Sequence, residues 1–164
     1  MLSFLVITGK RAMKMANSDF TATVDKKDYI KIMNALTDMS KIEREAAISK
    51  GISEGLDVIV RQGKANLAAS GTKVRTGNLK GSFKKLTRKR QLKGYAGFSR
   101  PKGAAAHLID RGTKVRHTKS GANRGSVTGN LFWTKAVNET KDKAQQELMD
   151  SIEKTIENII NRNK

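Results

Sequence analysis

Cysteine is absent from this chain of 164 residues, and histidine, proline and aromatic residues are scarce. The lack of cysteine excludes disulfide scaffolds, cysteine-based zinc sites and thiol nucleophiles. Two histidines are too few for a histidine-rich metal centre, and a single proline argues against a proline-rich linker. A chain of this length buries roughly two-thirds of its unfolded surface, so we expect one globular domain that needs no covalent staple.

Long apolar runs are also missing. The longest run, residues 2–7, is interrupted by Ser3 and is far shorter than the roughly 20 residues that span a membrane. It does not resemble a signal peptide, because its neighbouring basic residues follow it instead of preceding it. We expect residues 1–19 to form a flexible N-terminal extension. The alternative is that the first 14 residues are a mis-called start and that Met15 begins the chain. Residues 20–164 are then a single domain without a membrane partner.

Negative charge is scarce in the middle of the sequence. The chain has 33 Lys+Arg against 15 Asp+Glu, a net charge of +18. Residues 73–124 contain 16 of these basic residues and one acidic residue, Asp110, and so contribute +15. An uncompensated charge of this density predicts a polyanionic partner, most often nucleic acid, or an acidic protein surface. A solvated surface that only aids solubility is the alternative interpretation.

The apolar pattern predicts an α+β fold, with two N-terminal helices, a small antiparallel sheet arranged as a meander and a long C-terminal helix packed on it. Ser40 and Glu43 have the spacing of a capping box at the start of the second helix. Gly51, Gly55 and Gly63 inside this helix indicate close approach of another backbone. The expected elements are a strand over 20–24, helices over 26–37 and from 41 to about 70, strands over 81–89, 92–99 and 104–110, a long loop over 112–129 and a helix over 131–162.

Catalytic chemistry finds little support in the sequence. His107 and His117 are the only imidazoles, and His117 could act as a base only with a nearby acid, for which Asp110 is the candidate. We expect His107 to be a half-buried packing residue. A lone carboxylate among many cations is expected to be paired, and Arg75 and Arg111 are the candidate partners of Asp110. The chain is therefore expected to be non-enzymatic, with no catalytic residue, cofactor or metal site.

Three short segments resemble signatures of the small tail-component proteins of long-tailed, lambda-like phages, a family of head–tail joining, tail-completion or neck proteins. Thr76, Gly77, Leu79, Ser82 and Phe83 lie at the matching positions of the pattern A-P-x-x-T-G-x-L-x-x-S-I, whose proline before T-G is missing here. Residues 106–113 are similar to the pattern Y-A-x-x-V-E-x-G-T, with Asp110 in place of the glutamate. Residues 131–136 are similar to P-F-L-x-x-A, with Leu131 in place of the proline. The three segments occur in the family's order, and the resemblance covers residues 25 to 160.

The resemblance implies a structural protein of a virion, assembled in the bacterial host cytoplasm from a phage or prophage gene. It implies a ring of copies of this chain, joined to head–tail connector or tail-tube proteins. The alternatives are a sequence-nonspecific nucleic-acid-binding module and a small basic ribonuclease-like toxin. The residues that carry the motifs are expected to be structural: Thr76, Gly77, Leu79, Ser82, Asp110, Gly112, Thr113, Phe132 and Ala136.

The loop over 112–129 is the candidate surface for packaged double-stranded DNA or a protein partner. It carries Lys114, Arg116, His117, Lys119 and Arg124 and has no apolar period. Such a segment cannot offset its own ordering entropy, so we expect it to be mobile in the isolated protein. In a ring, its copies would form a positive collar that contacts phosphates without reading sequence.

Overall fold

The computed structural model describes residues 20–23, 39–72 and 77–162. Two long helices and a small sheet form the body, so the expected α+β fold is confirmed. The helix over 26–37 that the sequence predicts lies outside the described residues. The elements are β1 (Phe20–Thr23), α2 (Lys41–Ala69), the 3-10 turn η1 (Lys80–Ser82), β2 (Phe83–Arg88), the 3-10 turn η2 (Lys89–Gln91), β3 (Lys93–Phe98), α3 (Ala106–Arg111) and α4 (Phe132–Arg162).

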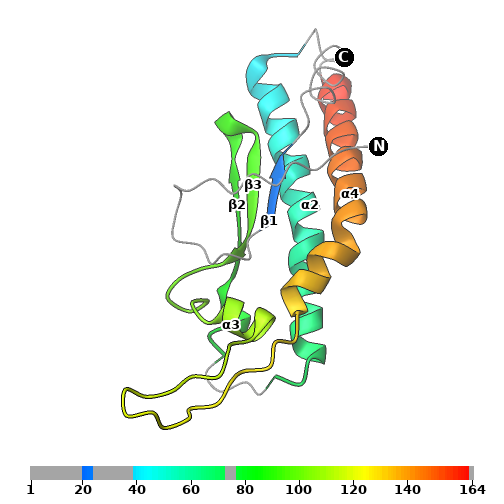
Figure 1. Ribbon diagram of the computed structural model, residues 1–164. Coiled ribbons are helices and arrows are strands. Elements are labelled where there is room, and N and C mark those ends of the chain that lie inside the picture. Colours follow the sequence, from blue (N-terminus) through cyan, green and yellow to red (C-terminus); the bar gives the residue numbers. More distant parts are fainter. Residues whose placement is uncertain (1–19, 24–38, 73–76, 163–164) are drawn as a thin grey trace.

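Helix α2 is the centre of the body, between the sheet on one side and α4 on the other (Figure 1). It begins with the predicted capping box: the Ser40 hydroxyl accepts from the Glu43 N–H, and the Glu43 carboxylate accepts from the Ser40 N–H at 3.0 Å. The Ser40 hydroxyl also donates to the Glu43 carboxylate at 2.7 Å, and this bond, together with the one from the Ser40 N–H, lowers the pKa of Glu43. The helix ends before Gly71, whose φ of +66° is the left-handed conformation that glycine adopts freely.

The glycines within α2 permit the close approach of α4 that the sequence predicts. A Cβ atom on Gly51 would lie 2.6 Å from the Leu148 carbonyl oxygen, and one on Gly55 would lie 2.6 Å from the Ala144 carbonyl oxygen. A Cβ atom on Gly63 would meet the Trp133 ring at 2.7 Å. Real side-chain carbons do not approach other atoms this closely, so alanine is too large at each of these sites.

The sheet has the order β1-β3-β2 and is antiparallel throughout. Gly94 of β3 faces Ile52 and Leu56 of α2, so this face of the sheet packs on the helix. Ala96 and Phe98 follow at two-residue spacing and are fully buried, as expected for alternating sides of a strand. The predicted hairpin of β2 and β3 is confirmed, with Phe83 paired to Phe98 and Arg88 paired to Lys93.

Four aromatic residues close the end of the body where α4 begins. The Phe83 ring centroid lies 4.8 Å from that of Phe98, and the Phe98 centroid lies 5.2 Å from that of Trp133. Phe132 contacts Phe83 edge-on at 6.2 Å. Phe132 and Trp133 are each 1% exposed, so their predicted packing on the sheet is confirmed. Such aromatic pairs contribute beyond their buried area.

One predicted strand is wrong. Residues 104–110 were expected to form the third strand of a meander, but α3 occupies Ala106–Arg111, and β1 is the strand that pairs with the free edge of β3. Three consecutive alanines, Ala104 to Ala106, favour helix, and the segment has few of the β-branched residues that favour strands. Gly112, which follows the predicted strand, is instead the residue at which α3 ends.

Replacement of Gly55 with alanine should destabilise the fold. The new Cβ would meet the Ala144 carbonyl oxygen, and overpacking of this kind costs about 1–3 kcal/mol, which exceeds the gain of up to about 1 kcal/mol in helix propensity. Urea denaturation followed by circular dichroism measures the change in the free energy of unfolding.

Gly81→Ala is the matched control, because a Cβ atom at Gly81 meets nothing within 4 Å. Its free energy of unfolding should stay within about 0.5 kcal/mol of the parent. An increased stability of Gly55→Ala would contradict the close helix contact.

Candidate functional site

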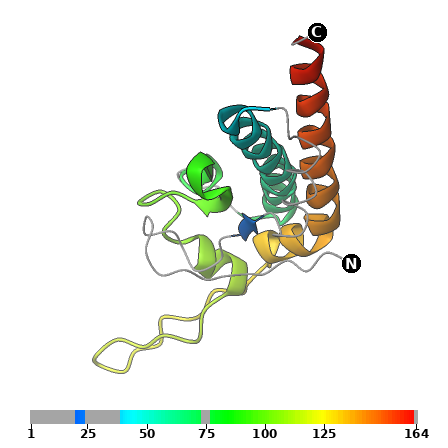
Figure 2. The same ribbon diagram turned by 90° about the horizontal axis from the view of Figure 1, so that it is seen from above.

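Residues 112–129 leave the body between α3 and α4 as a two-stranded hairpin, which we call the arm (Figures 1 and 2). The Thr113 N–H donates to the Val127 carbonyl at 2.8 Å. Further out, the Arg116 N–H donates to the Gly125 carbonyl at 3.0 Å, and the Arg124 N–H donates to the Arg116 carbonyl at 2.7 Å. The segment that the sequence predicts as a long loop has no regular helix or strand, but it is a hairpin held by backbone bonds near its base, middle and tip, with one bridge between His117 and Asn123. Its mobility in the isolated protein stays a prediction.

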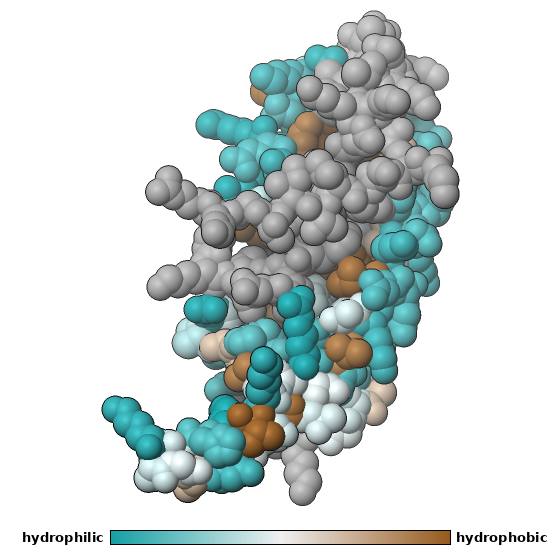
Figure 3. All heavy atoms as spheres, viewed as in Figure 1, coloured by the Kyte–Doolittle hydropathy of each residue, from teal (hydrophilic) through white to brown (hydrophobic). Residues whose placement is uncertain are grey.

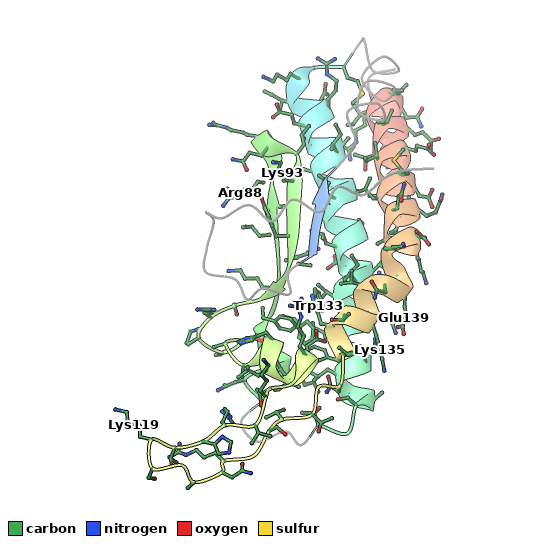
Figure 4. All side chains as sticks on the ribbon, viewed as in Figure 1. Arg88, Lys93, Lys119, Trp133, Lys135 and Glu139 are labelled. Atoms are coloured by element: carbon green, nitrogen blue, oxygen red, sulfur yellow. The ribbon has the colours of Figure 1, made fainter. Side chains whose placement is uncertain are left out.

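Glycines and short polar side chains shape the arm. At the tip, the Gly121 N–H donates to the Thr118 carbonyl at 3.0 Å, and Gly121 has a φ of +84°. Gly125, with a φ of +71°, donates its N–H to the Asn123 side-chain oxygen at 2.7 Å. Lys119 lies at the outermost turn, far from the labelled residues of the body (Figure 4). The arm thus gets its form from local backbone bonds, without an apolar core of its own.

The five residues predicted to face DNA or a partner all lie on the arm, and all are exposed. They are Lys114, Arg116, His117, Lys119 and Arg124. In the space-filling view, the projecting arm is mostly hydrophilic to neutral (Figure 3). Arg116 and Arg124 are opposite each other in the pairing, which places two like charges on one face of the ribbon. No carboxylate occurs in the sequence between Asp110 and Glu139 to offset them.

Asp110, in α3 just before the arm begins, binds the start of α4. Its side chain is fully buried. One carboxylate oxygen accepts from the Trp133 N–H at 2.8 Å and the Thr134 N–H at 3.2 Å, and the other accepts from the Thr134 hydroxyl at 2.6 Å. These N–H groups belong to the first turn of α4, where intrahelical partners are lacking and the helix dipole is positive. Asp110 is therefore the N-terminal cap of α4, supplied from a different helix.

The sequence predicts a paired, structural Asp110, and its contacts with α4 show the structural role. Pairing with an arginine stays a prediction, because Arg75 lies outside the described residues. Backbone N–H groups at a helix start are partners that the sequence analysis does not predict for this carboxylate, and they stabilise it where it is buried.

The two ends of the arm cross at a pair of glycines. A Cβ atom on Gly112 would lie 2.7 Å from the Gly129 nitrogen, and one on Gly129 would lie 2.7 Å from the Asp110 carbonyl oxygen. Next to them, the Asn130 side-chain oxygen accepts from the Phe132 N–H at 3.1 Å. The sequence analysis missed Gly129 and Asn130, although asparagine directly before an amphipathic helix is a cap signal that could have identified the second.

The other residues of the three motifs lie in turns, in the pairing of the arm or in the core. Thr76 lies outside the described residues. The buried Ser82 hydroxyl donates to the Leu79 carbonyl at 2.7 Å, and Gly77 has a φ of +69°. The Thr113 hydroxyl accepts from the Val127 N–H at 2.9 Å. Ala136 and Phe132 are buried in the core. Each of these residues shapes a turn, a pairing or a core contact.

Leu131 replaces the proline of the third motif, and its backbone explains why. Its φ is +56°, which the ring of proline, locked near −65°, cannot adopt. The Leu131 N–H donates to the Asp110 carbonyl at 2.8 Å, a bond that proline could not make. The side chain is 42% exposed, so the departure from the pattern is a matter of backbone geometry.

The structure does not bring the ribonuclease-like pair together. His117 is exposed on the arm, opposite Asn123, whereas Asp110 is buried and its oxygens accept from α4. His107 is half-buried in α3, as expected, and its Nδ1 atom is buried without a hydrogen-bond partner. The two imidazoles therefore occupy different environments and have no shared acid.

A second polar cluster lies on the body. The Lys85 Nζ atom donates to the Ser53 hydroxyl at 2.8 Å and pairs with the Asp57 carboxylate. These contacts join β2 to α2.

Other kinds of site were sought in the part of the chain that the structure describes. These residues contain no group of three or more His, Cys, Asp or Glu side chains that could hold a metal ion. None of the helices described is both long and apolar enough to cross a membrane.

Comparison with known protein families, curated proteins and solved structures found no match.

Replacement of Asp110 with alanine should destabilise the protein by about 1–3 kcal/mol, because two helix N–H groups and a hydroxyl lose their acceptor. Asp110→Asn keeps one oxygen for the two N–H groups and loses only the charge at the helix start, so its cost should be smaller. Urea denaturation of both variants measures the difference.

Asp142→Ala, at an exposed position of α4, is the control and should change the free energy of unfolding by less than about 0.5 kcal/mol. If Asp110→Ala denatures at the midpoint of the parent protein, Asp110 does not cap α4. If the asparagine variant is as unstable as the alanine variant, the carboxylate charge outweighs the hydrogen bonds.

Proposed function

We propose that the chain is a non-enzymatic structural subunit of a phage or prophage particle. It assembles as a ring at the head–tail junction or tail end, where it contacts connector or tail-tube proteins. The arm carries the contact with packaged DNA or with an acidic neighbour. The proposal starts from the resemblance of three sequence segments to small phage tail components.

The observation that carries the proposal is that these three segments form one unit in space. Phe83 of the first segment contacts Trp133 of the third, with ring centroids 5.9 Å apart. Asp110 of the second accepts from the Trp133 N–H. The unit lies where the arm leaves the body (Figure 1). Chance similarities scattered along a chain would have no reason to converge, so the convergence supports a shared structural purpose.

The distribution of charge supports an assembly role. The arm projects from the body with exposed cations on both of its strands, and a ring would repeat it around the symmetry axis. The summed positive potential would face a polyanion in the channel or an acidic neighbouring ring. A subunit of this kind needs no reaction centre, and Asp110, the buried carboxylate of the unit, holds the start of α4.

A sequence-nonspecific nucleic-acid-binding module is the second candidate, and the exposed cations of the arm are the observation that favours it. It differs from the first candidate in needing no particle and no ring.

Disruption of the coding sequence in the encoding phage or lysogen should leave filled heads and tails unjoined or incomplete in electron micrographs. The parent chain supplied in trans should restore infectious particles, because the missing part is a structural subunit. Native mass spectrometry of particle-derived material should show a closed oligomer of the chain.

The Asp142→Ala variant is the complementation control and should restore particles like the parent. Normal particles in the complete absence of the chain would contradict the virion role. That result, together with nucleic-acid binding by the purified chain, would favour the second candidate.

A further inference from the structure

We propose that the arm binds double-stranded DNA by lying in the major groove, where Lys114, Arg116, Lys119 and Arg124 contact phosphates. The inference deepens the proposed function and rests on it for the setting in which the arm meets DNA. Binding itself is a property of the chain, so it can be tested apart from particle assembly.

The shape of the arm fits this groove. The arm is a narrow hairpin of two antiparallel segments bridged at His117 and Asn123, and none of the described helices and strands packs on its outer part (Figure 2). The major groove of B-form DNA is about 12 Å wide and admits a two-stranded β-ribbon. Gly121, Ala122 and Gly125 keep the outer part of the arm narrow, since they carry little or no side chain.

The charges of the arm need an anion. Arg116 and Arg124 oppose each other across the pairing, an arrangement that is unfavourable for the isolated ribbon. Lys114 precedes this pair and Lys119 lies at the tip (Figure 4). Phosphates on both walls of a groove would neutralise both arginines at once, and each neutralised phosphate releases a counterion. The opposed pair is therefore unfavourable alone and favourable in the complex.

Three polar side chains of the arm accept hydrogen bonds from its own backbone. The Asn123 side-chain oxygen accepts from the Gly125 N–H, the Thr118 hydroxyl oxygen accepts from the Ala122 N–H at 3.0 Å, and the Thr113 hydroxyl accepts from the Val127 N–H. These are the residue types that could read base edges. Because they hold the ribbon together, the flexible cations are left as the main contacts, and binding should be independent of sequence.

Two features favour duplex DNA over other nucleic acids. Residues 112–129 contain no Phe, Tyr or Trp, and His117 is their only aromatic ring, so the arm offers little surface on which successive single-stranded bases could stack. Double-stranded RNA has a deep, narrow major groove that side chains cannot read, and a ribbon would not enter it.

The test compares two charge-matched variants. The arm variant carries Lys114→Gln, Arg116→Gln, Lys119→Gln and Arg124→Gln. The body variant carries Lys135→Gln, Lys141→Gln, Lys143→Gln and Lys154→Gln, all at exposed positions of α4. Fluorescence anisotropy with a 30-base-pair DNA duplex, a double-stranded RNA of the same sequence, single-stranded DNA and poly-glutamate measures affinity between 50 and 200 mM salt.

Four phosphate contacts predict a slope of about −3.6 in log K against log salt, so the affinity of the parent chain for duplex DNA should fall at least about 150-fold over this range. The slope of the arm variant should be shallower by about 3.6, while the body variant keeps the slope of the parent. The parent should bind two unrelated DNA duplexes equally and bind RNA duplex and single strands more weakly. Unchanged thermal unfolding of both variants confirms that folding is not the cause.

The inference is overturned if the parent does not bind duplex DNA, if both variants lose the same slope, or if RNA duplex binds as tightly as DNA. Poly-glutamate binding as tight as DNA binding would also overturn it and indicate an acidic protein partner. Loss of DNA binding in the arm variant supports the inference even if particles form without the chain. Absence of binding overturns it even if particles require the chain.

Discussion

The carboxylate of Asp110 at the start of α4 is the interaction on which the rest of the structure depends. It joins α3 to a helix of 31 residues through two backbone N–H groups and one hydroxyl. The same contact brings the two ends of the arm together, because Gly112 follows α3 and Gly129 and Asn130 precede α4. Without this cap, neither end of the arm would be fixed to the body, and the direction in which the arm projects would not be defined.

The body and the arm obey different physical rules. The body is stabilised by the close contact of α2 with α4 and by the aromatic residues that pack beneath the first turn of α4. The arm has no such core, and its form depends on short backbone bonds and on glycines at positive φ. The arm can therefore carry four cations, two of which are the opposed Arg116 and Arg124, without destabilising the body. Such separation suits a protein whose partner is a polyanion.

Much of the fold could be predicted because its signals are local. The capping box at Ser40, the glycines of α2 and the apolar periodicity of α4 each depend on residues a few positions apart. The candidate cations of the arm could be recognised for the same reason. The contact of Asp110 with the start of α4 could not be predicted, because it joins residues 23 positions apart and the sequence does not show which helix start lies near the carboxylate. The strand predicted over residues 104–110 was wrong because a short apolar run has no period that separates strand from helix.

The central claim is that the Asp110 cap of α4 fixes the two ends of the arm, while the tip of the arm stays mobile. Amide hydrogen exchange at Trp133 and Thr134 tests this claim most directly. If Asp110 accepts from these N–H groups in a buried site, they should exchange as slowly as the amides of Ile52 and Leu56 in the core of α2. The amides of Lys119 and Ser120 at the tip should exchange near the rate of an unfolded chain. Rapid exchange at Trp133 and Thr134, comparable to that of the tip, would contradict the account, because the start of α4 would then be as accessible to solvent as the tip of the arm.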